Sequence, residues 1–172
     1  MRGFALSARK KEKGGNFFSC RMNLLLFTVL IIALDQAAKF LVLKSLSLHQ
    51  SVALIPGVFH LTLVLNRGAA FGILKNQTIL FIASAVLAIF LIALDFFRKR
   101  TANRLYDISL CLIAAGAVGN LIDRLLRGYV VDFLDFRIWP VFNIADSAVT
   151  VGAILLGYTI LLQQKNTSER SQ

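Results

Sequence analysis

The 172-residue sequence has little charge for its length and few of the residues that build thiol and metal sites. Only 16% of its residues are charged, against about 25% in a typical soluble domain. There are two cysteines, Cys20 in a basic leader and Cys111 in an apolar run, and two histidines, His49 and His60. These residues form no cluster with metal-ligand spacing. We therefore predict no disulfide, no metal site and no cofactor.

The patterns of nucleophilic catalysis and of nucleic-acid binding are also missing. The sequence has no Gly-x-Ser-x-Gly or Cys-His pattern and no internal repeats, and its Ser-x-x-Lys at residues 7–10 lies in the basic leader, outside the apolar runs. Its net charge of +10 would suit a nucleic acid. However, the basic residues gather before the first apolar run and between the second and third, and no helix face carries a basic stripe with interleaved aromatics. We expect no nucleic-acid partner.

Apolar residues are abundant instead. They make up 57% of the chain, and the mean hydropathy is +0.70. Four stretches are long enough to cross a bilayer, at residues 24–43, 79–97, 108–126 and 145–162. We predict an all-α membrane protein of four transmembrane helices. Its domains would be a basic cytoplasmic leader at 1–22, a four-span domain at 23–164 and a cytoplasmic tail at 165–172.

The placement of Lys and Arg predicts the orientation. Twelve lie in the leader, the 98–104 loop and the tail, and six lie on the other side. Both termini should therefore be cytoplasmic, with loops 45–77 and 124–144 facing outward. The first run is too long for the apolar region of a cleaved signal and carries Asp35 and Lys39, so we read it as a true span. The leader is expected to be disordered or membrane-associated, and Met22 is an alternative start.

The outward loops carry strand patterns. Residues 57–66 alternate between apolar and polar after a Pro56-Gly57 turn, which predicts a strand with one apolar face. The following small residues, from Asn66 through Gly68 to Gly72, indicate either a tight turn or a wall of a substrate groove. In the second loop, an extended chain would point Asp132 and Asp135 to opposite faces. The apolar neighbours of Asp132 should raise its carboxyl pKa.

Ionisable side chains in membrane spans are expensive and suggest function. Asp35 and Lys39 are one helical turn apart, so their side chains share a face of the helix. They form either a neutralising pair in which Lys39 reaches the membrane interface, or a pair that supports an active site. Asn120, Asp123 and Arg124 share a polar face at the end of the third span, where we expect Arg124 to keep Asp123 ionised.

Asn143 and Asp146 open the fourth span. Helix capping would explain both residues. Two carboxylates at one site would also suit catalysis, because one keeps a proton while the other activates water. Spacing alone does not choose which aspartates pair, and it leaves a proton relay open.

Five segments, taken together and in order, resemble bacterial lipoprotein signal peptidase, the signal peptidase II family. They are Asp35 to Lys39, Asn66 to Gly72, Gly116 to Arg124, Val130 to Phe136 and Phe142 to Ser147, within residues 24–162. The leader lies outside the resemblance.

The resemblance implies an aspartic endopeptidase of the bacterial inner membrane, with a small extracytoplasmic β-cradle and an active site near the outer face. It would cut diacylglyceryl-modified prolipoproteins just before the lipidated cysteine, among membrane lipids, and we expect a monomer. The implied catalytic pair is Asp132 and Asp146, supported by Asp35, Lys39, Asn66, Gly68, Asn120, Asp123, Arg124 and Asn143. A small transporter or proton relay, and a structural adaptor, are the alternatives.

Overall fold

The computed structural model describes residues 2–68, 77–98 and 103–170. Its helices are α1 (Arg2–Ser45), α2 (Thr78–Arg98), α3 (Arg104–Arg127) and α4 (Ile144–Arg170), and its strands are β1 (Ser51–Ile55), β2 (Phe59–Asn66) and β3 (Val130–Asp135). Each predicted span lies in a helix that is long and apolar enough to cross a membrane. The predicted class, mostly helical with a small sheet, is confirmed.

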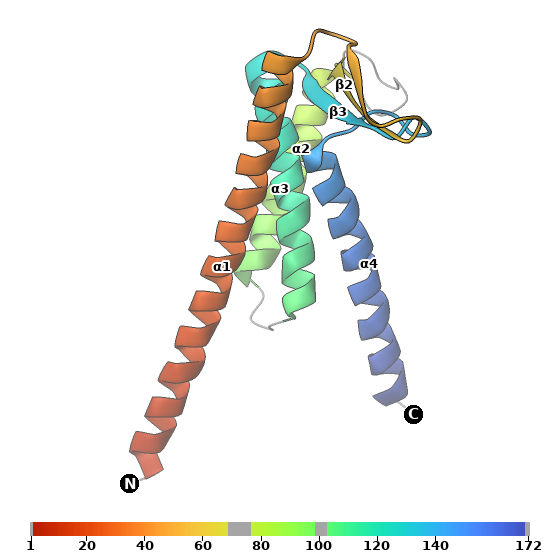
Figure 1. Ribbon diagram of the computed structural model, residues 1–172. Coiled ribbons are helices and arrows are strands. Elements are labelled where there is room, and N and C mark those ends of the chain that lie inside the picture. The colour runs from red at the N-terminus through yellow and green to blue at the C-terminus, as the bar shows by residue number, and fades with distance from the viewer. Residues whose placement is uncertain (1, 69–76, 99–102, 171–172) are drawn as a thin grey trace.

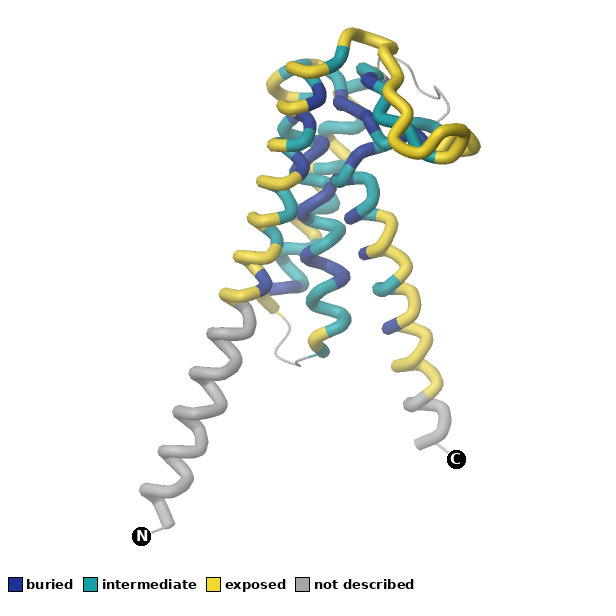
Figure 2. The backbone as a smooth tube through the Cα atoms, viewed as in Figure 1, coloured by how far each residue is buried: buried dark blue, intermediate teal, exposed yellow. Residues whose placement is uncertain are grey.

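The helices place both termini at one end of the molecule and the sheet at the other (Figure 1). Helix α3 packs against α1, α2 and α4, and buried residues concentrate on α3 and where it meets the sheet (Figure 2). The outer faces of the other helices are apolar and exposed, as at Ile79, Leu91 and Leu161. Such faces suit contact with lipid. Polar side chains are buried instead near the sheet, which makes this region the candidate for a functional site.

Helix α1 continues through the basic leader. It runs unbroken for 44 residues, about 66 Å at the α-helical rise and well beyond a hydrocarbon core of about 30 Å. The disorder that we considered for the leader is thus wrong, because the leader is a helical extension of the first span. The Arg, Lys and Glu residues at 9–13 are good helix formers, and their propensity favours continuing the helix beyond the apolar run.

The sheet is antiparallel, in the order β1-β2-β3. The predicted turn joins β1 to β2, where Gly57 has φ 73° and the Val58 amide donates to the Ile55 carbonyl. The predicted strand is confirmed as β2. Strand β1 was missed, because its residues are all exposed and show no apolar alternation. Residues 69–76, which include most of the small-residue motif after Asn66, lie outside the described residues.

Small residues let α3 and α4 approach closely. A Cβ atom added to Gly116 would lie 2.2 Å from the Ala145 carbonyl oxygen, and one added to Gly152 would lie 2.8 Å from the Ser109 carbonyl oxygen. Glycine at these points therefore sets the distance between the two helices. This packing brings the first turn of α4 against the polar face of α3.

We expect Gly116→Ala to lower the free energy of unfolding by about 1–3 kcal/mol, because backbone atoms of α4 must move to admit the methyl group. Gly157→Ala is the matched control, since a Cβ there meets nothing within 4 Å. Thermal unfolding in detergent micelles measures both. Equal midpoints for the two variants would contradict the close-packing argument.

Candidate active site

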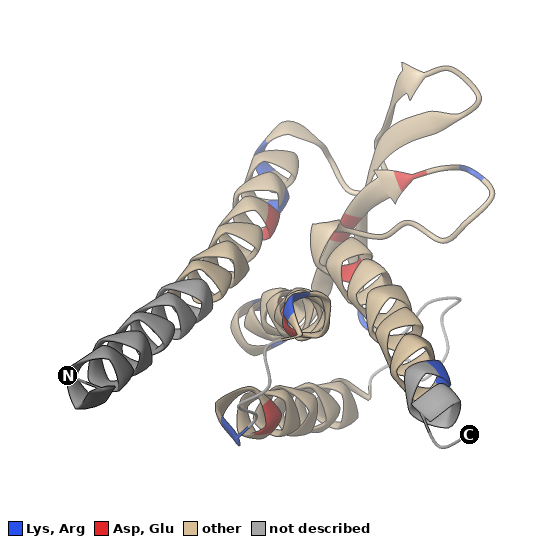
Figure 3. Ribbon diagram, turned by 90° about the horizontal axis from the view of Figure 1, so that it is seen from below, with Lys and Arg blue, Asp and Glu red and all other residues tan. Residues whose placement is uncertain are grey.

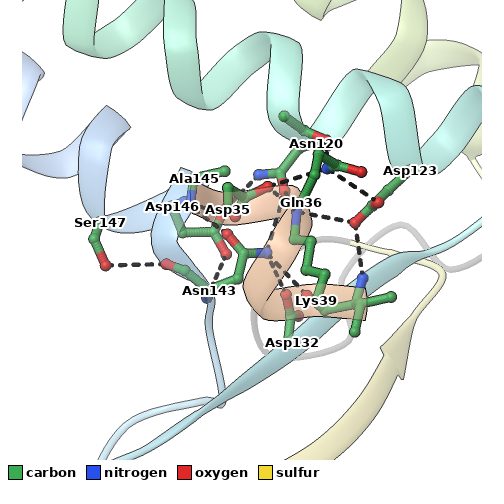
Figure 4. A network of polar contacts seen from close by, with 12 residues as sticks. Asp35, Gln36, Lys39, Asn120, Asp123, Asp132, Asn143, Ala145, Asp146 and Ser147 are labelled. Carbon is green, nitrogen blue, oxygen red and sulfur yellow. Dashed lines mark hydrogen bonds and ion pairs between the residues drawn. The ribbon is translucent and has the colours of Figure 1, made fainter. Parts of the chain in front are cut away.

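A network of polar side chains lies where the sheet meets the helices. It joins residues of α1, α3, β3 and the first turn of α4 (Figure 4). Most of its members are fully or nearly fully buried, including Asp35, Lys39, Asp123, Asp132 and Asn143. Burying a charge costs free energy unless the charge is paired. The partners of these buried side chains therefore explain how the network is stabilised.

Lys39 is the hub of this network. Its Nζ atom lies 2.8 Å from Asp35 Oδ2, 2.9 Å from Asp123 Oδ2 and 3.0 Å from Asn120 Oδ1. Three acceptors match the three donors of an ammonium group. The predicted Asp35–Lys39 pair is confirmed. The alternative of Lys39 reaching the interface is wrong, because its side chain is 0% exposed and two carboxylates offset its desolvation.

The two carboxylates around Lys39 also hold backbone. Asp35 Oδ1 accepts from the Ala145 amide at 2.9 Å, and Asp123 Oδ2 accepts from the Val131 amide at 3.1 Å. Each of those amides belongs to the residue directly before Asp146 or Asp132. The ion cluster therefore positions the peptide units that carry both of these acids.

Asp123 is paired differently from our expectation. Its partners are Lys39 and, at the i+4 position, Arg127. The guanidinium of Arg124 instead lies over the Phe81 ring, with its carbon 4.9 Å from the centroid. Consecutive helical residues point in different directions, whereas residues four apart share a face. The predicted pairing of Asp123 with Arg124 is thus wrong, and Arg127 takes that place.

Asn143 connects Asp132 and Asp146. Its Nδ2 donates to Asp132 Oδ1 at 2.7 Å, and its backbone N–H donates to Asp146 Oδ2 at 3.3 Å. The Asp146 amide donates to Asn143 Oδ1 at 2.8 Å, which completes the predicted capping arrangement. Capping does not compete with a role in the site, because it leaves Asp146 Oδ1 free to accept from Asn120 Nδ2 at 2.7 Å.

Asp132 and Asp146 face one cavity of about 410 Å³. From the predicted set, Asn66, Gly68, Asn120 and Arg124 also line it, whereas Asp35, Lys39, Asp123 and Asn143 are not among its lining residues. The rest of the lining is formed by Phe81, Val130, Trp139, Pro140, Val141, Phe142, Val149 and Thr150. The cavity thus combines two carboxylates with an apolar and aromatic surface.

The two acids of β3 have opposite environments. Burial, and next the charge of Asp146, raise the pKa of Asp132 to about 7, against hydrogen bonds from Asn66 and Asn143. At Asp135, burial opposes the shift, but bonds from the Thr62 hydroxyl and Arg137 lower the pKa. The opposite orientation predicted for the two acids agrees with these separate partners. Of the two acids of β3, Asp132 is the one poised to hold a proton near neutral pH.

Gln36 and Arg127 are two site residues that we did not single out. Gln36 Nε2 donates to the Gly119 carbonyl at 3.1 Å and contacts both Asp35 and Asp123. The i+4 spacing from Asp123 was the available signal for Arg127. Among the described residues, no group of His, Cys, Asp and Glu is arranged to hold a metal ion.

Known proteins resemble this chain along most of its length. Residues 27–162 match the family model of signal peptidase (SPase) II. A lipoprotein signal peptidase of Halothermothrix orenii is 48% identical over 80% of this chain and 94% of its own length. One of Moorella thermoacetica is 47% identical over 82% and 94%. A solved bacterial membrane enzyme superimposes with a TM-score of 0.80 at 33% identity, over 84% of this chain and 90% of its own.

We expect Lys39→Met to cost about 3–5 kcal/mol of unfolding free energy, because it leaves two buried carboxylates without their shared cation. Lys44→Met on the same helix is the control. Lys44 is exposed and lies over the Phe40 ring at 4.5 Å, so its loss should cost about 1 kcal/mol or less. Chemical unfolding in micelles distinguishes them. If the Lys39→Met protein were as stable as the Lys44→Met protein, Lys39 would not be the cation on which the buried network depends.

Proposed function

The chain belongs to the signal peptidase II family, and we propose that Asp132 and Asp146 are the two aspartates with which it cuts its substrate. Proteases of this family remove signal peptides from prolipoproteins. The observation that carries the assignment is that Asp132 and Asp146 line the same cavity and are bridged by one residue, Asn143. Asp35, Asp123 and Asp135 are instead engaged by cations.

The environments of Asp132 and Asp146 favour a state in which the two carboxyl groups share one proton. Like charges held close together cannot both ionise cheaply, so the pair keeps a proton. The pKa of about 7 at Asp132, which Asp146 helps to raise, is consistent with this coupling. Asn120 and Asn143 donate to these carboxylates and orient their oxygens toward the cavity.

The reaction then needs only these two groups and a water. The ionised aspartate takes a proton from a water held between the pair, and the resulting hydroxide attacks the scissile carbonyl carbon. The protonated aspartate donates to the carbonyl oxygen. When the tetrahedral intermediate collapses, the carbon–nitrogen bond breaks, and the leaving amine takes a proton from the pair.

The substrate and the orientation extend the proposal. Diacylglyceryl-modified prolipoproteins would be cut just before the lipidated cysteine, with the lipid along the bilayer and the peptide in the cavity beneath the sheet. The apolar and aromatic part of the cavity lining suits that position.

Both termini would be cytoplasmic and the site would lie near the outer face. This orientation agrees with the excess of Lys and Arg at the end of the molecule that carries the termini. The active unit would be a monomer, since all these residues come from one chain.

We expect Asp132→Asn and Asp146→Asn each to abolish processing of a lipidated prolipoprotein while the protein still accumulates in the membrane. Asp135→Asn, in the same strand, should remain active because Asp135 binds Thr62 and Arg137. Gel-shift assays on purified variants measure the cleavage. Normal processing by Asp132→Asn or Asp146→Asn would refute the assignment.

The pH profile should depend on Asn66. Loss of the shared proton should reduce kcat/KM above about pH 7, the pKa of Asp132. The hydrogen bond from Asn66 Nδ2 to Asp132 Oδ2, 3.0 Å long, favours the ionised carboxylate. Asn66→Ala should therefore raise this pKa and move the alkaline limb to higher pH by about one unit or less, the equivalent of one hydrogen bond.

Thr62→Val is the control for that profile, because Thr62 donates to Asp135 rather than to Asp132. Its alkaline limb should coincide with that of the unmodified protein. A limb that moves to lower pH in Asn66→Ala, or stays in place, would show that Asp132 does not set it.

A further inference from the structure

A second cavity lies at the other end of the helices, away from the sheet. It has a volume of about 290 Å³ and is lined by Asn23, Leu24, Phe27, Arg104 and Ile108. Asn23 and Arg104 stand at the outermost turns of the spans that begin at Met22 and Arg104. Phe27 and Ile108, each four residues on from Asn23 and Arg104, lie one turn further into the spans. The cavity is therefore polar at the membrane edge and apolar inside.

This order of groups matches the order within a phospholipid. The guanidinium of Arg104 is planar and can bind a phosphate through two parallel hydrogen bonds. The Asn23 side chain adds amide donors next to it. No acidic residue is among the described residues that line the cavity. From these lining residues an anionic headgroup would meet hydrogen-bond donors and one positive charge.

The charge of this end of the molecule favours the same ligand. Arg98 ends α2, Arg104 begins α3, and Lys165 ends the fourth apolar span. Figure 3 views the molecule from this end, with the Lys and Arg positions of the ribbon in blue. Clustered basic residues attract the anionic lipids of the cytoplasmic leaflet. We propose that the cavity between α1 and α3 binds the headgroup of an anionic phospholipid, with its phosphate on Arg104.

The acyl chain has a path along α1. Phe27, Leu30 and Leu34 are spaced by three and four residues, so they share one face. Their side chains are 39%, 55% and 54% exposed. This stripe spans about 10 Å of helix, a large part of one leaflet's share of a hydrocarbon core of about 30 Å. The headgroup occupies the cavity, and one chain lies along the stripe.

The test uses the full-length protein in phosphatidylcholine nanodiscs doped with phosphatidylglycerol. Native mass spectrometry counts retained phosphatidylglycerol, and thermal unfolding gives the stabilisation. Arg104→Gln should weaken retention about tenfold or more, the loss of one charge-assisted hydrogen-bonding group. Arg98→Gln removes an equal charge from the same end, outside the cavity lining, and should retain the lipid within about twofold of the unmodified protein.

A third variant, Ile108→Trp, keeps Arg104 but fills the cavity, and it should also lose the lipid. Equal loss in Arg104→Gln and Arg98→Gln would overturn the proposal in favour of diffuse surface attraction. So would equal retention of phosphatidylcholine and phosphatidylglycerol by the unmodified protein. The Arg104→Gln protein should still process a prolipoprotein, because Arg104 lies at the opposite end of the molecule from the candidate catalytic pair. This retained activity serves as the control that the variant is folded.

Discussion

A buried ammonium group between two buried carboxylates organises the end of this molecule that carries the cavity. Lys39 pairs with Asp35 and Asp123, and each carboxylate also accepts a hydrogen bond from a backbone amide of another element. Those amides belong to Ala145 and Val131, so α4 and β3 are both tied to α1 and α3. Removing Lys39 would take from the buried Asp35 the cation that it pairs with and would leave Asp123 with Arg127, so the amides that both carboxylates hold depend on this one ammonium group.

The carboxylates of the proposed catalytic pair are held differently from those of the cluster. Asp132 and Asp146 receive hydrogen bonds from the neutral amides of Asn66, Asn120 and Asn143. An amide orients a carboxylate without fixing its charge as strongly as a cation does. The site thus separates two tasks: charged partners hold the backbone in place, and neutral partners leave the reacting groups able to exchange a proton.

Much of this was predictable from the sequence, and the failures have physical causes. Hydropathy predicted all four spans because lipid demands about 20 apolar residues in a row. Helical spacing predicted the Asp35–Lys39 pair, and the same rule would have found Arg127 in place of Arg124. The contact of Lys39 with Asp123 joins two helices, so no local pattern encodes it. Strand β1 escaped because its residues are all exposed and show no apolar alternation, so that its pairing with β2 is what identifies it.

The same-helix pairing of Asp35 with Lys39 has a consequence for biosynthesis. The first span can enter the bilayer as a neutral segment, before its other partners exist, because its charges compensate each other within one helical turn. Asp123 joins them when α3 has been made, and the Ala145 amide joins last, with the final span. The proposed catalytic site is thus assembled from the first and third spans, β3 and the fourth span, so a nascent chain lacks the complete site until the fourth span has been made.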